Sequence, residues 1–289
     1  MKIALGTVQF GVDYGIANVS GQVSRSEISA IINASNQYGI STIDTASAYG
    51  SSEARLGEVG VSGFDIISKL KPIPVSTLNV KDWVLNSVQR SLYDLRVDSL
   101  YGLLLHEPSD LLGPQGIELR AGLLSVKSAG FVKKIGVSIY NPAMLTVLDP
   151  ILEIDLVQVP FSPIDQRLKT SGWLERLNQR GIEVHTRSTF LQGLLLMPKQ
   201  QRPAYFETWS VLFLEWDNWL QMNNLTALEG ALGFVNSFNE IDKIVVGVDS
   251  VDQLKQIINI YLDNIKSLPP FFSCSEDTNL IDPSNWKLN

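Results

Sequence analysis

Residues 134–159 read KIGVSIYNPAMLTVLDPILEIDLVQV, and the order of their segments decides the fold. An apolar, β-branched run at 134–138 is followed by a stretch of helical periodicity at 142–148 and by a second apolar run at 156–159. Strands that alternate with helices in this way form βαβ units, in which the two strands lie parallel in one sheet. This stretch therefore predicts an α/β fold built on a parallel sheet.

The same alternation continues on both sides of this unit. Further strands are expected at 2–6, 41–44, 65–69, 99–105, 183–188 and 243–246, and further helices at 24–38, 80–95, 117–128, 168–179, 226–238 and 251–262. Eight strands, with no stretch that looks like a linker, predict a single-domain (β/α)8 TIM barrel. A doubly wound sheet has fewer strands and usually a glycine-rich first turn. The expected barrel spans residues 1–266.

Three further segments carry local predictions. Ser24 stands three residues before Glu27, a spacing that predicts a capping box at the start of the helix at 24–38. Residues 203–222 are rich in tryptophan and phenylalanine, and we expect a helical cover over the barrel mouth or rim. Residues 267–289 contain Pro-Pro and little periodicity, which predicts a tail that wraps the barrel or is disordered.

Composition excludes several classes of protein. The 289 residues include 23 basic and 30 acidic side chains, a net charge of −7 that disfavours a nucleic-acid-binding surface. One cysteine, Cys274, and two histidines, His106 and His185, argue against a disulfide framework and a metal centre. No apolar run reaches roughly 18 residues, and the N-terminal apolar stretch is too short for a signal peptide. We expect a cytoplasmic protein, monomeric by default, without metal, membrane or nucleic-acid partners.

Common catalytic and phosphate-binding motifs are missing from the sequence. Gly57, Gly60 and Gly63 have dinucleotide-like spacing, but they precede an expected strand instead of following one. No Walker A sequence and no Gly-x-Ser-x-Gly elbow occurs, and His106-Glu107 lacks the second histidine of a zincin. Hydrolase mechanisms based on a metal or a serine therefore lose most of their support.

Polar side chains recur where the expected strands end. In a (β/α)8 barrel the carboxyl ends of the strands form the active-site face, so these side chains are expected to share one face. A polar residue at one strand end can simply be structural, but six in register indicate a site. The six are Asp44, Lys69, His106, Ser138, Gln158 and Ser188.

Four residues from the second to the fourth strand suggest a chemistry: Asp44, Tyr49, Lys69 and His106. Neighbouring strands are about 4.8 Å apart, so side chains at their ends can converge. A phenol has a reference pKa of about 10, an adjacent ammonium lowers it, and a carboxylate holds that ammonium in place. A histidine beside the phenol can orient a carbonyl oxygen. Such an assembly suits protonation of a carbonyl oxygen while hydride reaches the carbon.

The sequence resembles the aldo-keto reductase superfamily, whose members are (β/α)8 barrels that use NAD(P)H. The resemblance extends from Leu5 to about Leu262, and the order Asp, Tyr, Lys, His at the strand ends is its specific part. It implies reduction of an aldehyde or ketone, with Tyr49 as general acid, Lys69 and Asp44 tuning it, and His106 orienting the substrate. The matching segments include Leu5-Gly6-Thr7, Ile43-Asp44-Thr45-Ala46, Tyr49-Gly50, Ser68-Lys69, Leu104-Leu105-His106, Gly136-Val137-Ser138 and Leu191-Gln192-Gly193.

The resemblance also implies how NAD(P)H would be held. Ser138 and Gln158 would bind the nicotinamide carboxamide, and Ser188 and Gly193 would line the pyrophosphate path. Arg187 stands where many members have an aromatic residue that stacks on the nicotinamide ring. The adenosine end would lie beyond the eighth strand, near Gly247, Asp249, Ser250 and Gln253.

Two departures from the family pattern bear on cofactor choice. Ile139 follows Ser138 where many members have asparagine, which removes a polar contact. Asp249 replaces the usual cation, and its carboxylate repels a 2′-phosphate but can accept hydrogen bonds from a ribose diol. The sequence thus favours NADH, or a looser grip on NADPH through backbone N–H groups at the start of the following helix.

Two other functions stay open. One is a non-catalytic, cofactor-binding regulatory subunit, against which the intact set of four residues argues. The other is a barrel isomerase or lyase that acts on a phosphorylated sugar. That enzyme would need a phosphate site after the seventh and eighth strands, where Asp249 has the wrong charge.

Overall fold

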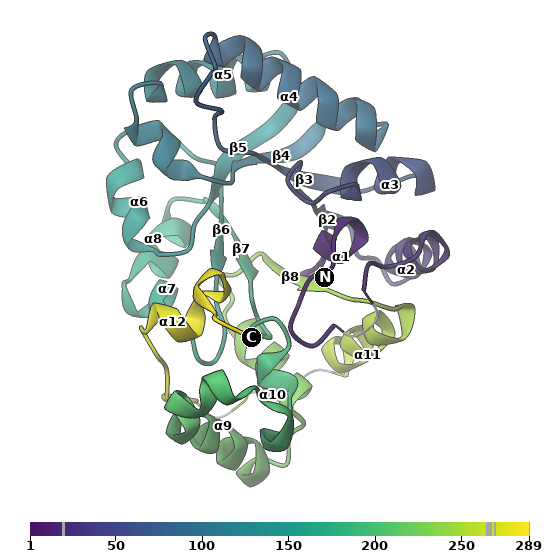
Figure 1. Ribbon diagram of the computed structural model, residues 1–289, viewed down its shortest axis with the longest axis vertical. Coiled ribbons are helices and arrows are strands. Elements are labelled where there is room, and N and C mark those ends of the chain that lie inside the picture. Colours follow the sequence, from purple (N-terminus) through teal and green to yellow (C-terminus); the bar gives the residue numbers. More distant parts are fainter. Residues whose placement is uncertain (19–20, 264–267, 269, 289) are drawn as a thin grey trace.

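The computed structural model describes residues 1–18, 21–263, 268 and 270–288. Eight parallel strands close into a barrel in chain order, with β1 paired to both β2 and β8 (Figure 1). This confirms the predicted (β/α)8 fold. The strands are β1 (Ile3–Gly6), β2 (Thr42–Asp44), β3 (Asp65–Leu70), β4 (Leu100–Leu105), β5 (Val132–Ser138), β6 (Leu156–Pro160), β7 (Glu183–Arg187) and β8 (Lys243–Gly247).

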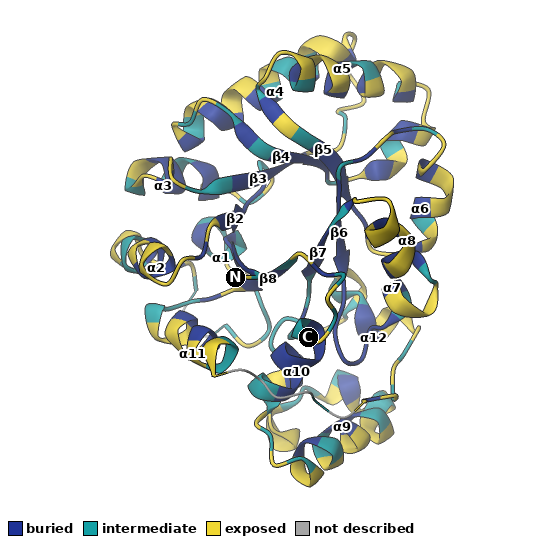
Figure 2. Ribbon diagram, turned by 180° about the vertical axis from the view of Figure 1, so that it is seen from behind, coloured by how far each residue is buried: buried dark blue, intermediate teal, exposed yellow. Residues whose placement is uncertain are grey.

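The helices surround the barrel and turn their buried sides toward it (Figure 2). They are α1 (Val8–Gly11), α2 (Arg25–Gln37), α3 (Ser52–Val59), α4 (Val80–Leu95), α5 (Gly116–Ser128), α6 (Ala143–Leu148), α7 (Arg167–Thr170), α8 (Trp173–Gln179), α9 (Ser210–Met222), α10 (Ala227–Asn236), α11 (Val251–Leu262) and α12 (Thr278–Ile281). Short 3-10 turns lie at η1 (Pro108–Leu112), η2 (Leu194–Leu196), η3 (Lys199–Gln201), η4 (Ala204–Trp209) and η5 (Pro283–Asn285). Within the part of the chain described, no helix is long and apolar enough to cross a membrane.

The sequence prediction missed or joined some of these helices. It named no helix over α3, whose eight residues are too short to show a strong period. The single helix expected at 168–179 is in fact two, α7 and α8, because Gly172 between them adopts a left-handed conformation with φ of 74°. The helix is interrupted at Gly172 because glycine has no Cβ and adopts a left-handed conformation without steric strain.

The capping box predicted for α2 is only half formed. Ser24 accepts a hydrogen bond from the backbone N–H of Glu27, as expected. The carboxylate of Glu27 does not return to Ser24 but accepts from the N–H of Val251, at 2.6 Å, at the start of α11. Glu27 therefore joins the first long helix of the barrel to the last one.

The barrel interior is tightly packed beneath the active-site end. Ile67, Leu104 and Leu156 form a buried apolar cluster inside the ring of strands. Gly136 on β5 is required there, because a Cβ at that position would lie 1.9 Å from the carbonyl oxygen of Leu156.

His185, on β7, is buried with its Nε2 3.5 Å from Glu183, and both ring nitrogens lack a hydrogen bond within the described chain. Its place in the middle of β7, away from the strand end, indicates a structural role.

The aromatic segment at 203–222 is helical, as predicted, but it does not cover the mouth. It forms η4 and α9, and α9 packs on the outer side of α10 (Figure 1). Close packing at this contact needs Gly230, since a Cβ there would lie 2.4 Å from Leu220 and 3.0 Å from Trp216. The segment thus belongs to the rim of the barrel.

The described part of the C-terminal tail wraps the protein. Phe271, Leu280 and Ile281 are buried, and Trp286 packs edge-on against Phe206 of η4 at 4.9 Å between ring centroids. The tail and the aromatic segment therefore cover each other. The expected boundary between barrel and tail, at 266/267, lies outside the described residues.

Candidate active site

The four predicted catalytic residues meet at the carboxyl end of the barrel. Asp44 ends β2, Lys69 is the penultimate residue of β3, and His106 follows β4 directly. Tyr49 lies in the connection between β2 and α3. Parallel pairing of the three strands brings their ends side by side, which is why these side chains converge.

Lys69 is the centre of the group. Its ammonium donates hydrogen bonds to both carboxylate oxygens of Asp44, at 2.8 and 2.7 Å, and to the carbonyl of Thr45, at 3.1 Å. It also lies 3.2 Å from the hydroxyl oxygen of Tyr49. Burial opposes the charge on Lys69, but the carboxylate of Asp44 outweighs it and raises the pKa of Lys69. The lysine is therefore a charged ammonium at neutral pH, held beside the phenol.

His106 packs edge-on against Tyr49. Their ring centroids are 6.0 Å apart and the planes are at 83°. Burial, together with the positive charges of Lys69 and Arg187, lowers the pKa of His106 to about 4. The imidazole is therefore neutral at physiological pH, so that one ring nitrogen can donate a hydrogen bond and the other can accept one.

Gln158 links a predicted cofactor residue to the catalytic group. Its side chain is fully buried, and its amide nitrogen donates to Asp44 at 2.6 Å. Its amide oxygen lies 3.4 Å from the hydroxyl of Ser138. Ser138 and Gln158 thus form a chain with Asp44, and β6 reaches across the barrel to hold the carboxylate of β2.

Arg187 ends β7 and is held in a defined position. Its guanidinium lies over the ring of Tyr140, 4.1 Å from the centroid, and donates to the carbonyl of Ile139 at 3.2 Å. It also lies 3.4 Å from the hydroxyl of Ser188, whose φ of 62° ends the strand. The side chain of Ile139 is apolar and offers no polar contact here, but its backbone carbonyl accepts the hydrogen bond from Arg187.

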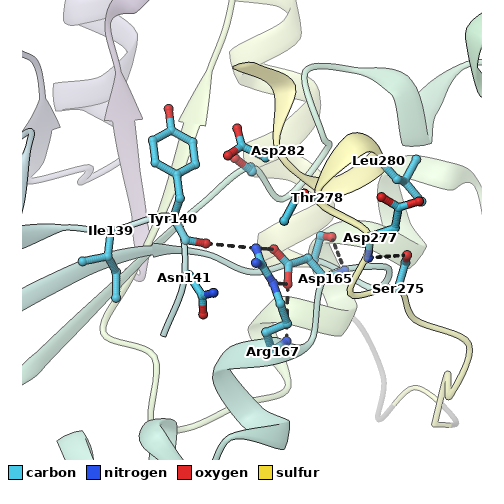
Figure 3. A network of polar contacts seen from close by, with 12 residues as sticks. Ile139, Tyr140, Asn141, Asp165, Arg167, Ser275, Asp277, Thr278, Leu280 and Asp282 are labelled. Atoms are coloured by element: carbon cyan, nitrogen blue, oxygen red, sulfur yellow. Dashed lines mark hydrogen bonds and ion pairs between the residues drawn. The ribbon is translucent and has the colours of Figure 1, made fainter. Parts of the chain in front are cut away.

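A second arginine ties this region to the tail. Arg167 forms a two-pronged ion pair with Asp165, at 2.8 Å, and donates to the carbonyl of Tyr140, at 2.9 Å (Figure 3). Against the effect of burial, the pair with Asp165 and the charge of Asp282 in the tail raise the pKa of Arg167, and the backbone N–H of Ser275 donates to the carbonyl of Ile164 at 2.8 Å. The tail therefore supports the segment that contains Ile164 and Arg167, and Arg167 in turn holds the Tyr140 carbonyl.

The loops after β1 and β7 meet at the mouth. Gln192 donates to the hydroxyl of Tyr14 at 3.1 Å. Gly193 has a φ of 90°, and a Cβ there would lie 2.5 Å from Cβ of Ala17. Burial raises the pKa of Tyr14, which also feels the charge of Arg187. The expected pyrophosphate residues, Ser188 and Gly193, thus belong to a loop that is closed against the first one.

The residues beyond β8 form a separate group at the start of α11. Ser250 caps this helix by accepting from the N–H of Gln253, at 3.2 Å, while the Gln253 side chain accepts from the N–H of Asp249, at 2.8 Å. Gly247, at the end of β8, lies against Gln9, because a Cβ there would be 2.6 Å from the Gln9 amide nitrogen. No hydrogen bond within the described residues joins this group to the catalytic four.

Sequence reasoning missed Tyr14 and Tyr140, which frame the mouth. Tyr140 lies just beyond the end of β5, and Tyr14 lies beyond α1 in the connection that leads to α2; neither connection has a motif of its own. An aromatic side chain in such a loop gives no pattern that separates a site residue from packing. In the part of the chain that the structure describes, no three acidic, histidine or cysteine side chains cluster as a metal site.

Comparison with known proteins agrees with this architecture. The family model described as "Aldo/keto reductase family" matches residues 2–267. The chain is 28% identical over 159 residues to the oxidoreductase YdhF of Escherichia coli, and 30% identical over 104 residues to the uncharacterized oxidoreductase YcsN of Bacillus subtilis. These alignments cover 49% and 35% of this chain, and 53% and 34% of the two relatives. The match therefore spans about half or less of either relative.

Among solved structures, the fold is similar to that of the aldo-keto reductase AKR11C1 from Bacillus halodurans in its holo form. The TM-score is 0.72, with 16% sequence identity, over 96% of this chain and 94% of that one. At this identity the likeness concerns the fold. The family model, which spans nearly the whole chain, goes further and confirms the resemblance seen in the sequence. The chain belongs to the aldo/keto reductase family.

Proposed function

We propose that the protein is a nicotinamide-dependent oxidoreductase that reduces an aldehyde or ketone to an alcohol. The observation that carries this proposal is the buried chain from Asp44 through Lys69 to Tyr49, with Nζ 3.2 Å from the phenol oxygen. A phenol held against a fixed ammonium can release its proton, because the resulting phenolate gains a charged hydrogen-bond partner. The neutral imidazole of His106 stands beside it.

Each residue has a distinct part in the reaction. Tyr49 gives its hydroxyl proton to the carbonyl oxygen, and Lys69 stabilises the phenolate that forms. Asp44 keeps Lys69 charged and fixed, and Gln158 holds Asp44. His106 donates an N–H to the carbonyl oxygen and orients it beside Tyr49. Oxidation of the alcohol follows the same path in reverse, with Tyr49 taking up the proton.

The mouth fits a ligand rich in amide and hydroxyl groups. Gln9 Oε1, Thr189 Oγ1 and Asp249 Oδ1 are buried polar atoms without a partner among the described residues. They follow β1, β7 and β8, three adjacent strands of the barrel. Buried polar atoms are normally hydrogen-bonded, so such a row points to a bound partner. When bound, a nicotinamide cofactor supplies the hydride that reaches the carbonyl carbon.

The residues that would hold the cofactor form two groups. The first lies near the catalytic four and would take the nicotinamide and pyrophosphate parts: Ser138, Gln158, Arg187, Ser188 and Gly193. The second lies at the start of α11 and would take the adenosine part: Gly247, Asp249, Ser250 and Gln253.

The adenosine group favours NADH over NADPH. A helix start attracts phosphate through its free N–H groups. Here the N–H of Val251 is taken by the Glu27 carboxylate, that of Gln253 by Ser250 and that of Asp249 by the Gln253 side chain. Two carboxylates, Glu27 and Asp249, would also repel a 2′-phosphate. These engaged N–H groups argue against the looser grip on NADPH and favour a ribose diol as the partner of Asp249.

A binding and turnover experiment tests the proposal. NADH and NADPH are titrated against tryptophan fluorescence, and oxidation of the better ligand is followed with a panel of aldehydes and ketones. Tyr49→Phe is expected to keep cofactor binding and to lower kcat by about 10²- to 10⁴-fold. Tyr93→Phe on the exposed surface of α4 is the matched control.

The outcomes separate the alternatives. Binding without turnover, unchanged in Tyr49→Phe, would indicate a regulatory subunit. Absence of binding by either cofactor at about millimolar concentration would overturn the proposal.

A further inference from the structure

Arg187 reaches from the end of β7 to the residues that are proposed to hold the nicotinamide. Its guanidinium donates to the carbonyl of Ile139 at 3.2 Å and lies 3.4 Å from the hydroxyl of Ser188. Ile139 directly follows Ser138, whose hydroxyl lies 3.4 Å from the side-chain oxygen of Gln158. The guanidinium thus contacts both the neighbour of a proposed carboxamide residue and a proposed pyrophosphate residue.

The register of the strands joins the same region to the catalytic group. β6 pairs with β5 and with β7, so that Ser138 lies opposite Gln158 and Arg187 lies opposite Pro160. Gln158 in turn donates to the catalytic carboxylate of Asp44 at 2.6 Å. A nicotinamide whose carboxamide is held by Ser138 and Gln158 would therefore lie close to both the catalytic four and the Arg187 guanidinium.

The charge of Arg187 is not balanced by an acidic side chain. Among the residues that the structure describes, no carboxylate lies at ion-pair distance from its guanidinium, whereas the ammonium of Lys69 is paired with Asp44. A guanidinium stays protonated at any physiological pH. The half-buried side chain therefore places a permanent positive charge at the mouth.

The guanidinium is also held in a fixed orientation. One of its faces lies over the ring of Tyr140, 4.1 Å from the centroid. The carbonyl of Tyr140 is held by Arg167 at 2.9 Å. A planar guanidinium that stacks on one ring can take a second planar group on its opposite face. Because the side chain is fixed before a ligand binds, the protein sets the distance between this charge and a bound ring.

The nicotinamide ring differs in charge between the two forms of the cofactor. It is neutral in NADH and carries one positive charge in NAD⁺, because the hydride that leaves takes an electron pair with it. A fixed cation beside the ring therefore repels NAD⁺ and does not repel NADH. From these observations we propose that Arg187 discriminates between the oxidation states of the cofactor, so that the protein binds NADH and rejects NAD⁺. This inference rests on the proposed reductase function.

This discrimination favours carbonyl reduction through occupancy. Repulsion of NAD⁺ keeps the protein loaded with NADH when both forms are present, and it weakens inhibition by the oxidised product. The same repulsion opposes the charge that the ring gains, so bound NADH becomes a weaker hydride donor. The contribution of Arg187 therefore lies in the choice of cofactor form and not in acceleration of the hydride step.

The test compares NAD⁺ with benzamide adenine dinucleotide, in which a neutral benzamide ring replaces the charged nicotinamide ring. The two ligands share their shape and their pyrophosphate and adenosine parts, so the ratio of their dissociation constants isolates the charge of the ring. In titration calorimetry the native protein should bind the neutral analogue about 10- to 100-fold more tightly than NAD⁺. This range lies between the values for two unit charges about 4 Å apart in water and in a partly buried site.

Variants of Arg187 separate its charge from its shape. Arg187→Gln keeps a planar N–H donor but removes the charge, and the ratio should fall to near one. Arg187→Lys keeps the charge, and most of the native ratio should remain. A residue that only supported the fold would give the same ratio in both variants. ADP-ribose, which lacks the nicotinamide, reports any change in the shared part of the site, and Arg90→Gln, on the exposed face of α4, should leave the ratio unchanged.

The outcomes distinguish this inference from the proposed function. Equal affinity of the native protein for NAD⁺ and the neutral analogue would overturn the inference, while binding of the two would still support a nicotinamide-dependent protein. A native ratio that persists in Arg187→Gln would assign the discrimination to another group and overturn the role of Arg187. The first comparison needs no variant, so it holds even where a variant does not fold. Absence of binding by NADH, NAD⁺ and the analogue would overturn both proposals.

Discussion

The ammonium of Lys69 lies within 2.8 Å of both carboxylate oxygens of Asp44 and 3.2 Å from the hydroxyl of Tyr49. One buried cation therefore connects a carboxylate to a phenol. The lysine is only 1% exposed, so water does not screen this interaction. The buried ion pair thus fixes a positive charge beside the phenol oxygen.

Asp44→Asn should damage both stability and catalysis. The substitution leaves Lys69 buried without an anion, which costs about 3–5 kcal/mol of unfolding free energy. Because the pKa of Lys69 is raised by Asp44, the variant should also lose its ammonium at a lower pH than the native protein. Thermal unfolding and the pH profile of kcat measure the two effects. Asp98→Asn, an exposed change, is the control, and a native-like melting temperature in Asp44→Asn would contradict the argument.

Gln158→Met tests the bond across the barrel. The variant loses the 2.6 Å hydrogen bond to Asp44 in a fully buried place and leaves one carboxylate oxygen with fewer donors. We expect a loss of about 1–3 kcal/mol in urea unfolding. It should also weaken cofactor binding in a fluorescence titration. Full stability together with full binding would mean that the bond from β6 is dispensable.

The proposed preference for NADH should be adjustable at Asp249. Asp249→Ser removes a carboxylate whose pKa is raised by burial and which has an oxygen without a partner. The ratio of the dissociation constants for NADPH and NADH should therefore fall. Asp82→Asn, in the first turn of α4, gives a matched control at another helix start. A native protein that binds NADPH more tightly than NADH would refute the assignment of this group.

Protonation of His106 should lower stability in acid. Its pKa is about 4 in the folded protein and about 6.5 in an unfolded chain. Between these values the unfolded chain binds a proton that the folded protein does not, so the unfolding free energy falls as the pH decreases from 6.5 toward 4. In His106→Gln the difference between the unfolding free energies at pH 7.5 and 4.5 should be smaller than in the native protein. An identical difference would show that His106 does not titrate in this way.

The sequence predicts the barrel and part of the site for a simple reason. Strand and helix periods alternate along the chain, and parallel strands must end on a common face. That rule alone places Asp44, Lys69 and His106 together, and the structure agrees. Tyr49 is expected near these three residues because it lies only five residues beyond the end of β2.

Other contacts depend on how the barrel closes, which no local pattern records. The bond between Gln158 and Asp44 joins β6 to β2, which lie on opposite sides of the ring (Figure 2). The stacking of Arg187 on Tyr140 likewise joins the end of β7 to the loop after β5. Glu27 shows the same limit, since its spacing from Ser24 predicts a bond within its own helix while the fold offers Val251. Local sequence rules describe what a side chain can do, and the tertiary fold selects among the options.

The bond between Glu27 and Val251 also constrains how the proposed cofactor preference can evolve. It spans 224 positions in the sequence and fastens the seam where the first and last units of the ring adjoin. A lineage that freed this helix start for a phosphate by replacing Glu27 would loosen the seam at the same step. Replacement of Asp249 leaves that fastening intact. Under the proposed function, exchange of one nucleotide for the other is therefore more accessible through position 249 than through position 27.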